Sequence, residues 1–278
     1  MALGPQIPNL GAIPAEGPAC LTLVGVGPGD PELLTVAAVR AIQAADRVAY
    51  PVAREGAEGM AAAIAARWIA AGQRRLPLLF PMVADAGPRI AAWHAAADAL
   101  AAAVAAGERV VLLCEGDVSL FASSSYVLLA LHKRHPGCPL RLIPGVPAVC
   151  AAAAAAAGSG MARPLGLQSE GLLIRPTPET PAELLQLLER AAGDDTVLAL
   201  LKLGHRWSWV RPLLAARGLL EGALFAQRVG WPDQLLAPAA AVPAEVQPYF
   251  SLLLIRPGWP VVWPGDTLPC VKGRGGRR

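Results

Sequence analysis

The fold is decided by the stretch LTLVGVGPGDPE, Leu21–Glu32, in which an apolar run leads into three closely spaced glycines and then into Pro31 and Glu32. The apolar run is typical of a buried strand, and proline followed by an acid is typical of a helix start. Glycines let the backbone turn sharply and approach a ligand closely. The stretch predicts a strand, a tight turn and a helix, and we favour a nucleotide-type ligand site at the turn over a plain turn.

The turn departs from the dinucleotide-binding fingerprint. Its glycines are spaced G-x-G-x-G, and the acid about 20 residues further on, Asp46, precedes the second predicted strand, whereas a ribose-binding acid should follow it. Asp30 lies where a carboxylate meets the positive end of the next helix dipole, so capping is its structural interpretation.

Working outward, short apolar runs alternate with alanine-rich amphipathic segments, which is the rhythm of a parallel sheet covered by helices. The first unit has predicted strands at Leu21–Val26, Arg47–Tyr50, Leu76–Phe80, Arg109–Cys114 and Leu140–Ile143, and predicted helices at Glu32–Ala45, Met60–Ala71, Arg89–Ala106 and Leu120–Lys133. The stretch Leu142–Gly158, which contains Pro144, Gly145 and Pro147 before its alanine run, predicts a turn followed by a buried helix.

Gly158, Ser159, Gly160 and Pro164 form a composition break of the kind that joins domains. Beyond it, strands are predicted at Gly171–Arg175, Thr196–Leu203, Ala223–Arg228 and Phe250–Arg256, with helices at Pro181–Ala192 and Trp207–Ala216. No helix separates the last two strands, which indicates a mixed sheet. We therefore expect an α/β protein with an N-terminal arm (1–19), an α/β domain (20–160), a second α/β domain (161–257) and a basic Pro/Gly-rich tail (258–278).

Two further loops follow predicted strands of the first unit. One contains Glu115-Gly116-Asp117 and the other contains Pro144-Gly145-Val146-Pro147. Ligands of open α/β sheets bind outside the carboxyl ends of the strands, so three such loops together favour one site. Taken alone, Asp117 is interpreted as a helix N-cap.

Composition excludes several classes of protein. In 278 residues the chain has 54% hydrophobic and 16% charged residues and a net charge of +3, which excludes a disordered chain and a strongly basic nucleic-acid binder. No apolar stretch reaches membrane-spanning length, and no Lys or Arg precedes Arg40, so we expect a cytoplasmic protein. Five scattered cysteines predict reduced thiols, and His132 with His135 on a basic helix end predicts no metal site.

The ordered motifs resemble the tetrapyrrole methylases. The resemblance is carried by Val24–Thr35 with Ala44–Pro51 downstream, then by Glu115-Gly116-Asp117, Ile143–Val146, Leu201-Lys202-Leu203 and Tyr249–Leu253, and it covers about residues 20 to 257. Within the family, the blocks Asp85–Trp93, Gly116–Phe121 with Tyr126, and Pro248–Ser251 are most similar to the enzymes that methylate C20 of precorrin-2.

The resemblance implies two α/β domains with the active cleft between them, S-adenosylmethionine as methyl donor, and a homodimer. The apolar pattern of Phe250–Ile255 on both faces also suggests a dimer. By motif, the implied cofactor contacts are Pro28, Gly116, Asp117, Leu120, Pro147, Ala148, Leu201, Ala226 and Gln227. The family usually has Ser or Thr where this chain has Pro147, and commonly Met where it has Leu201.

The implied reaction is methyl transfer to C20 of precorrin-2 or its cobalt form in cobalamin biosynthesis, without nucleic-acid or membrane partners. The substrate carries acetate and propionate carboxylates, so basic side chains should hold it; the candidates are Arg54, Arg89, Lys202 and Arg206. Asp30 is the candidate catalytic base, with capping as its alternative. Two other interpretations stay open: methylation at another ring position or of uroporphyrinogen III, and a non-catalytic cofactor-binding paralogue.

Overall fold

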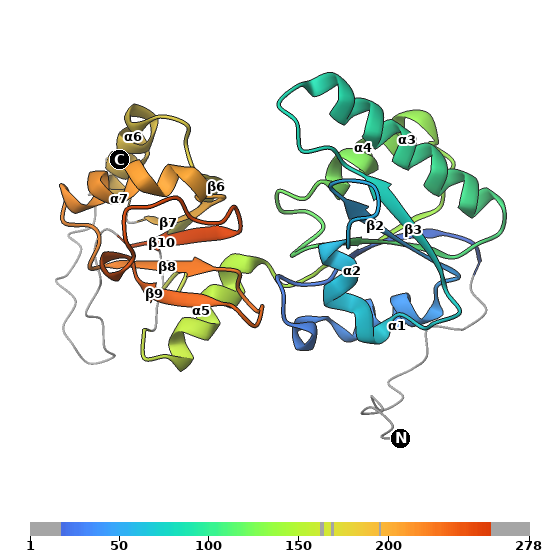
Figure 1. Cartoon of the computed structure of the whole chain (residues 1–278), viewed down its shortest axis with the longest axis horizontal. Helices are drawn as coiled ribbons and strands as arrows, with labels where there is room; N and C mark the ends of the chain where they lie inside the picture. The colour runs from blue at the N-terminus through green and yellow to red at the C-terminus, as the bar shows by residue number, and fades with distance from the viewer. Residues whose placement is uncertain (1–17, 162–163, 168–169, 195, 257–278) are drawn as a thin grey trace, which may run out of the picture. The chain divides into compact units, whose positions relative to one another are not determined.

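The computed structural model describes residues 18–161, 164–167, 170–194 and 196–256, and the chain divides into two compact units (Figure 1). Unit 1 comprises residues up to 162 together with 226–236, and unit 2 comprises 163–225 and the residues from 237 onward. The predicted N-terminal arm, except for its last two residues, and the predicted basic tail lie outside the described residues.

Unit 1 contains a five-stranded sheet in the order β3-β2-β4-β1-β5. Its strands are β1 (Leu21–Gly25), β2 (Arg47–Val52), β3 (Arg74–Leu79), β4 (Val110–Cys114) and β5 (Leu140–Ile143). Every pairing is parallel, and Gly25 lies opposite Cys114 where β1 and β4 end. The central strands β1 and β4 are buried throughout, which is why their sequences are almost wholly apolar.

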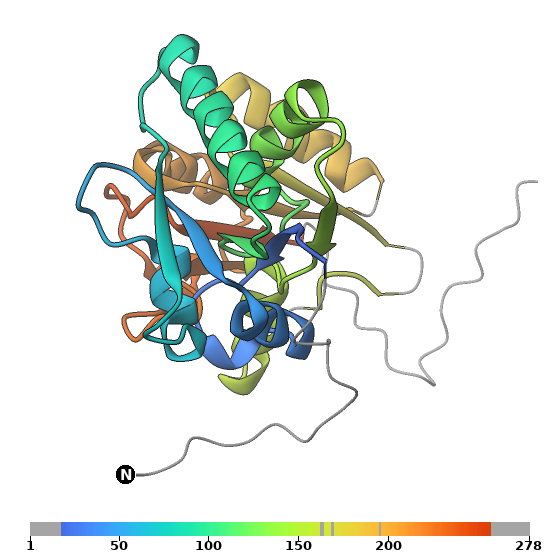
Figure 2. The same ribbon diagram turned by 90° about the vertical axis from the view of Figure 1, so that its right-hand side faces the viewer.

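Helices cover both faces of this sheet, with α3 and α4 on one side and α1 and α2 on the other (Figures 1 and 2). The helical segments of unit 1 are η1 (Pro31–Leu33), α1 (Val36–Ala44), α2 (Met60–Ala65), η2 (Ala66–Trp68), α3 (Ala86–Ala105), α4 (Ser124–Arg134) and α5 (Ala148–Gly158). Alternate residues of β4 enter the two cores: Leu112 packs with α3 and α4, and Leu113 with α1.

Two predicted helices begin later than expected, each for a local reason, and a third, predicted at Met60–Ala71, is α-helical only to Ala65. The segment 32–45 splits because Thr35 caps α1, its hydroxyl accepting the Ala38 N–H at 3.1 Å, while Leu34 before it is extended. The segment 120–133 begins as a helix only at Ser124, because Phe121 has φ +53°, which no right-handed helix accommodates.

Unit 2 contains a second five-stranded sheet, in the order β6-β7-β10-β8-β9. Its strands are β6 (Gly171–Pro176), β7 (Thr196–Leu201), β8 (Ala223–Gln227), β9 (Leu235–Pro238) and β10 (Ser251–Ile255). Strand β6 is parallel to β7 and β10 is antiparallel to it, so the mixed sheet is confirmed. The helical segments are α6 (Pro181–Gly193), η3 (Gly204–Arg206), α7 (Trp207–Ala215) and η4 (Ala239–Ala241).

Strand β9 and the interior place of β10 in the sheet were not predicted from the sequence. Strand β9 has four residues, ends in Pro238 and lies at the sheet edge, where the pattern is weak. Strand β10 is interior and every residue in it is buried. Its two-faced apolar pattern is therefore explained within the chain and does not by itself call for a second copy.

The division of the chain differs from the expected one at the boundary, which lies after residue 162 and not after 160, and in one further segment. Residues 226–236, expected in the second domain, belong to unit 1. The reason is local packing: the Trp231 indole N–H donates to the Pro28 carbonyl at 2.9 Å, and the ring packs against the apolar core around α1. None of the helices in the described residues is both long and apolar enough to span a bilayer.

Candidate functional site

The three predicted loops of unit 1 meet at one edge of its sheet. They follow β1, β4 and β5, and these strands are neighbours in the order β4-β1-β5, so their carboxyl ends lie side by side. We call residues 25–30, 115–119 and 144–148 together the glycine loops. This is the edge at which open α/β sheets bind ligands.

Backbone packing between the glycine loops leaves no room for a side chain at Gly25 or Gly145. Gly27 and Gly116 exchange backbone hydrogen bonds, at 3.2 Å from the Gly27 N–H and 2.7 Å from the Gly116 N–H. A Cβ on Gly25 would lie 2.5 Å from the Gly145 nitrogen, and a Cβ on Gly145 would collide with the Gly116 carbonyl. Glycine is required here by close approach, so the three turns form one unit.

Asp117 ties two of the glycine loops together. Its side chain accepts the Ser119 N–H at 2.8 Å and the Ser119 hydroxyl through Oδ1, and the Gly145 N–H at 2.9 Å through Oδ2. Burial alone would raise the pKa of this carboxyl, but the hydrogen bonds outweigh burial and hold the pKa below its usual value. The N-cap interpretation of Asp117 is wrong, because α4 begins seven residues later and its N-cap is Ser123.

Glu115 has the opposite electrostatic environment two residues before Asp117. Burial raises its pKa, and one hydrogen bond from the backbone of Ala61, at the start of α2, partly offsets this effect. No motif in the sequence indicated a role for this side chain. The two acids of the E-G-D sequence therefore have different environments. The Asp117 carboxylate accepts three hydrogen bonds, whereas the Glu115 carboxyl is poorly solvated because it is buried.

Asp30 and Pro28, on the first glycine loop, are both engaged in structure. Asp30 caps η1, its Oδ1 accepting the Glu32 N–H at 2.8 Å, as the capping interpretation expects. The Pro28 carbonyl accepts the Trp231 indole N–H, and a Cβ on Gly230 would collide with the Asp30 nitrogen. Residues 228–234 thus cover the first loop, although about 200 residues of chain separate them. The contact between Trp231 and Pro28 could not be predicted from the sequence, because no local pattern marks a contact between such distant residues.

Ligand-facing features remain at the glycine loops. A Cβ on Gly116 would meet no atom within 4 Å, so its α-carbon faces open space. Helix α5 starts at Ala148 after Pro147, and no side chain caps it, so its first N–H groups are free of side-chain acceptors. These features fit a small polar ligand approaching backbone. Of the other motif positions in unit 1, Leu120 is half-buried beside Asp117, and Ala226 and Gln227 end β8.

Two of the four candidate substrate cations lie in unit 1 and two lie in unit 2. Arg54 is exposed in the segment after β2, and Arg89 uses its guanidinium on the carbonyls of Ala84 and Asp85 at its own helix start. In unit 2, Arg206 pairs with Glu179 and also donates to the Lys202 carbonyl at 3.2 Å. The Lys202 side chain makes no ion pair in the described part of the chain.

The described residues contain no group of three His, Cys, Asp or Glu side chains suited to a metal. His135 instead contacts Asp98 at 2.7 Å. Four described cysteines, at positions 20, 114, 138 and 150, are free, and burial raises the pKa of the Cys114 thiol to about 12.

The fold and the glycine loops define an α/β protein with a candidate ligand site at the carboxyl ends of the strands of a parallel sheet. The chain matches the family model of the tetrapyrrole (corrin/porphyrin) methylases over residues 20–241, and it belongs to that family. The resemblance stated from the motifs is thereby confirmed.

Two relatives and one solved structure are similar to this chain over most of its length. A precorrin-2 C(20)-methyltransferase of Sinorhizobium sp is 32% identical over 85% of this chain and 94% of its own. The cobalamin biosynthesis protein CobIJ of Mycobacterium bovis is 35% identical over 84% of this chain but only 45% of its own, so the chain spans less than half of that protein. The crystal structure of the methyltransferase CobJ is similar with a TM-score of 0.61 and 26% identity, covering 85% of this chain and 93% of CobJ.

Proposed function

We propose that this protein transfers a methyl group from S-adenosylmethionine to C20 of precorrin-2, or of its cobalt form, in cobalamin biosynthesis. The observation that carries the proposal is the 32% identity to a precorrin-2 C(20)-methyltransferase across 94% of that enzyme. The interlocked glycine loops support the same function, because they offer a backbone-lined site without a catalytic triad. A homodimer, which rests on the family resemblance, and a cytoplasmic location, which rests on the sequence, belong to this proposal.

The proposed cofactor contacts are the motif positions named from the sequence: Pro28, Gly116, Asp117, Leu120, Pro147, Ala148, Leu201, Ala226 and Gln227. Asp117 would act through its backbone, since its side chain is committed to Ser119 and Gly145. At Pro147 the missing hydroxyl is offset by the uncapped N–H groups at the start of α5.

S-adenosylmethionine supplies a methyl group already activated by its sulfonium. What the chain's residues contribute is placement and exclusion of water, and placement of two reactants is worth about 7–11 kcal/mol. The rigid backbone packing of Gly25, Gly116 and Gly145 suits that task. Arg54, Arg89 and Lys202 are the proposed cations of the substrate side, whereas Arg206, the fourth candidate, is already paired to Glu179.

A matched pair of glycine variants tests the cofactor site. Gly116 and Gly107 both have positive φ, and at neither would a Cβ meet an atom within 4 Å, but Gly107 precedes β4 and Gly116 follows it. Gly116→Ala and Gly107→Ala should each lose about 1 kcal/mol of stability from backbone strain. Calorimetry with S-adenosylhomocysteine should show at least tenfold weaker binding only for Gly116→Ala. Equal affinity in both variants, or no binding by the folded wild type, would remove the cofactor assignment.

Asp30→Asn tests the proposed base. Asn caps a helix as well as Asp does, so the variant should fold normally and slow turnover only a few-fold if Asp30 serves as a cap. Loss of all turnover with intact binding of both ligands would make Asp30 the group that removes the C20 proton.

A further inference from the structure

Lys202 adopts a backbone conformation that is uncommon for its residue type. It follows β7 directly and has φ +59°, in the left-handed region that glycine favours. Such conformations persist only where the surrounding structure enforces them, and they cluster at ligand sites. We call the turn Leu201–Gly204 the Lys202 turn. Its conformation indicates that neighbouring residues hold it in place and that it is a candidate ligand site.

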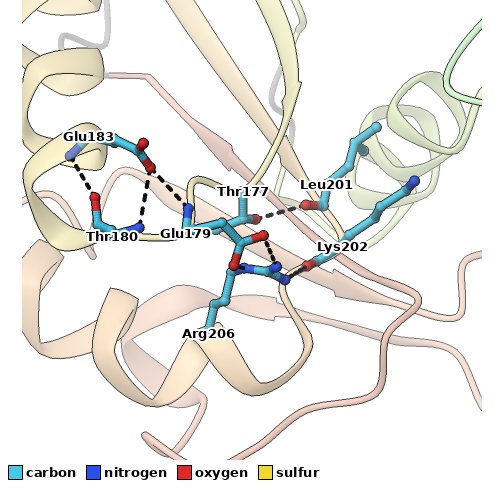
Figure 3. A network of polar contacts seen from close by, with 7 residues as sticks. All are labelled: Thr177, Glu179, Thr180, Glu183, Leu201, Lys202 and Arg206. Carbon is cyan, nitrogen blue, oxygen red and sulfur yellow. Dashed lines mark hydrogen bonds and ion pairs between the residues drawn. The ribbon is translucent and has the colours of Figure 1, made fainter. Parts of the chain in front are cut away.

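The cause is a set of hydrogen bonds on both sides of the turn, of which Figure 3 shows those made by Thr177 and Arg206. Thr177 donates its N–H and its hydroxyl to the Leu201 carbonyl, at 2.7 and 2.8 Å. Arg206 donates to the Lys202 carbonyl at 3.2 Å. Ser251 accepts the Leu203 N–H at 3.1 Å through its carbonyl and the Gly204 N–H at 3.4 Å through its hydroxyl.

The same network neutralises one cation and leaves the other without an acid. Arg206 pairs with Glu179, and the pKa of Glu179 is lowered by that hydrogen bond. The Lys202 side chain points away from this pair (Figure 3), and its ammonium lies 5.8 Å from the centre of the Tyr249 ring. Within the described residues no carboxylate pairs with it.

We propose that Lys202 binds a carboxylate of the protein's ligands and that Arg206 is a positioning residue, holding the turn that presents Lys202. This inference rests on the proposed function, in which the tetrapyrrole and the methyl donor both carry carboxylates. The ammonium of a half-buried lysine, near an aromatic ring and without an acid partner in the described residues, is suited to bind an anion. The role expected for Arg206 from sequence, direct binding of substrate, is replaced by an indirect one because Glu179 occupies its guanidinium.

Three variants separate the charge of Lys202 from its backbone strain. Lys202→Gly removes the ammonium and relieves the positive φ, so its thermal midpoint should equal or exceed that of wild type, while its KM for precorrin-2 rises at least fivefold and kcat changes less. Lys202→Arg keeps a cation and should stay within twofold of wild-type KM. The salt dependence of KM should be weaker in Lys202→Gly, because one ion pair is gone.

Arg206→Gln tests the positioning role. It should raise KM two- to threefold, and the double variant with Lys202→Gly should be no worse than Lys202→Gly alone, because Arg206 acts through Lys202. Additive losses would show that Arg206 binds substrate itself.

The source of the carboxylate is read from S-adenosylhomocysteine binding. Unchanged affinity in Lys202→Gly, with the raised KM, assigns the carboxylate to the tetrapyrrole; weakened affinity with unchanged KM assigns it to the methyl donor. No change in either, or a loss of both with a lowered thermal midpoint, overturns the proposal. If wild type does not methylate precorrin-2, the proposed function fails separately, and titration of wild type and Lys202→Gly with uroporphyrin, which bears acetate and propionate groups, still decides the role of Lys202.

Discussion

The glycine loops of unit 1 and the Lys202 turn of unit 2 both follow strand ends, yet they are built in opposite ways. In unit 1 the backbones of Gly25, Gly116 and Gly145 touch, so the shape is set by the absence of side chains. In unit 2 a bulky residue takes the conformation that glycine would favour, held by side chains such as Thr177 and Arg206.

Because the two sites are held in different ways, they should respond differently to amino-acid substitution. A methyl group added at Gly25 or Gly145 would collide with backbone atoms of the neighbouring loops, so it disrupts several loops at once. A turn held by several separate hydrogen bonds loses one bond at a time and weakens gradually. Four substitutions test whether the glycine loops tolerate change less well than the Lys202 turn, and they follow in order of decreasing expected loss of stability.

Gly145→Ala should be the most damaging substitution. Its Cβ would collide with the Gly116 carbonyl and lie within 2.9 Å of the Gly25 α-carbon, and all of these atoms are backbone. We expect a loss of about 3 kcal/mol or more in the free energy of unfolding and no binding of S-adenosylhomocysteine. The matched control is Gly158→Ala at the end of α5, where a Cβ meets nothing within 4 Å. Denaturation curves showing equal stability for the two variants would contradict the interlock.

Asp117→Asn should come next, because an amide cannot accept from both Ser119 and Gly145. One buried donor is left unpaired, at a cost of about 1–3 kcal/mol. Since the folded pKa of Asp117 lies below its ordinary value, the stabilisation is present above that value and is lost as pH falls below it. Asp85→Asn, at an exposed helix cap, should be nearly neutral. Urea denaturation at neutral and acidic pH measures both.

Thr177→Val should have a smaller effect in unit 2. It removes the hydroxyl bond to the Leu201 carbonyl but keeps the backbone N–H bond to the same atom. We expect about 1 kcal/mol of lost stability and a modest rise in KM for precorrin-2. A collapse as severe as that of Gly145→Ala would show that the Lys202 turn is as intolerant as the glycine loops.

Asp46→Asn should have the smallest effect, at the opposite edge of the unit 1 sheet. Hydrogen bonds from the Arg109 side chain and backbone lower the pKa of Asp46 to about 2. Its stabilisation is therefore present above the unfolded pKa of about 4 and is lost as pH falls toward 2. Because the carboxylate is 37% exposed and solvent-screened, the difference from wild type at neutral pH should be at most about 1 kcal/mol. Affinity for S-adenosylhomocysteine should not change; if it does, the two sheet edges are coupled.

The contrast also explains what the sequence could predict. Glycine spacing and apolar runs are local signals, so the strands of unit 1, the three loops and the family resemblance were all accessible from the sequence. The α/β fold with a mixed second sheet is confirmed on the same grounds.

Contacts between distant segments were not accessible. Trp231 reaches Pro28 across about 200 residues. Thr177 and Glu179, in the loop between β6 and α6, and Ser251, at the start of β10, hold the Lys202 turn from two distant parts of the chain. None of these side chains occurs in a spacing that marks its role. The positive φ of Lys202 could not be predicted from the sequence either, because nothing around it in the sequence favours that conformation.

The position of the transferred methyl group tests the central claim most directly. The full-length protein is incubated with precorrin-2 and S-adenosylmethionine carrying an isotope-labelled methyl, and the product is examined by NMR and mass spectrometry. The account predicts one labelled methyl per macrocycle, attached to C20. Label at any other carbon would keep the chain among the tetrapyrrole methylases but contradict the proposed reaction, and no transfer by a protein that binds both ligands would make it a non-catalytic relative.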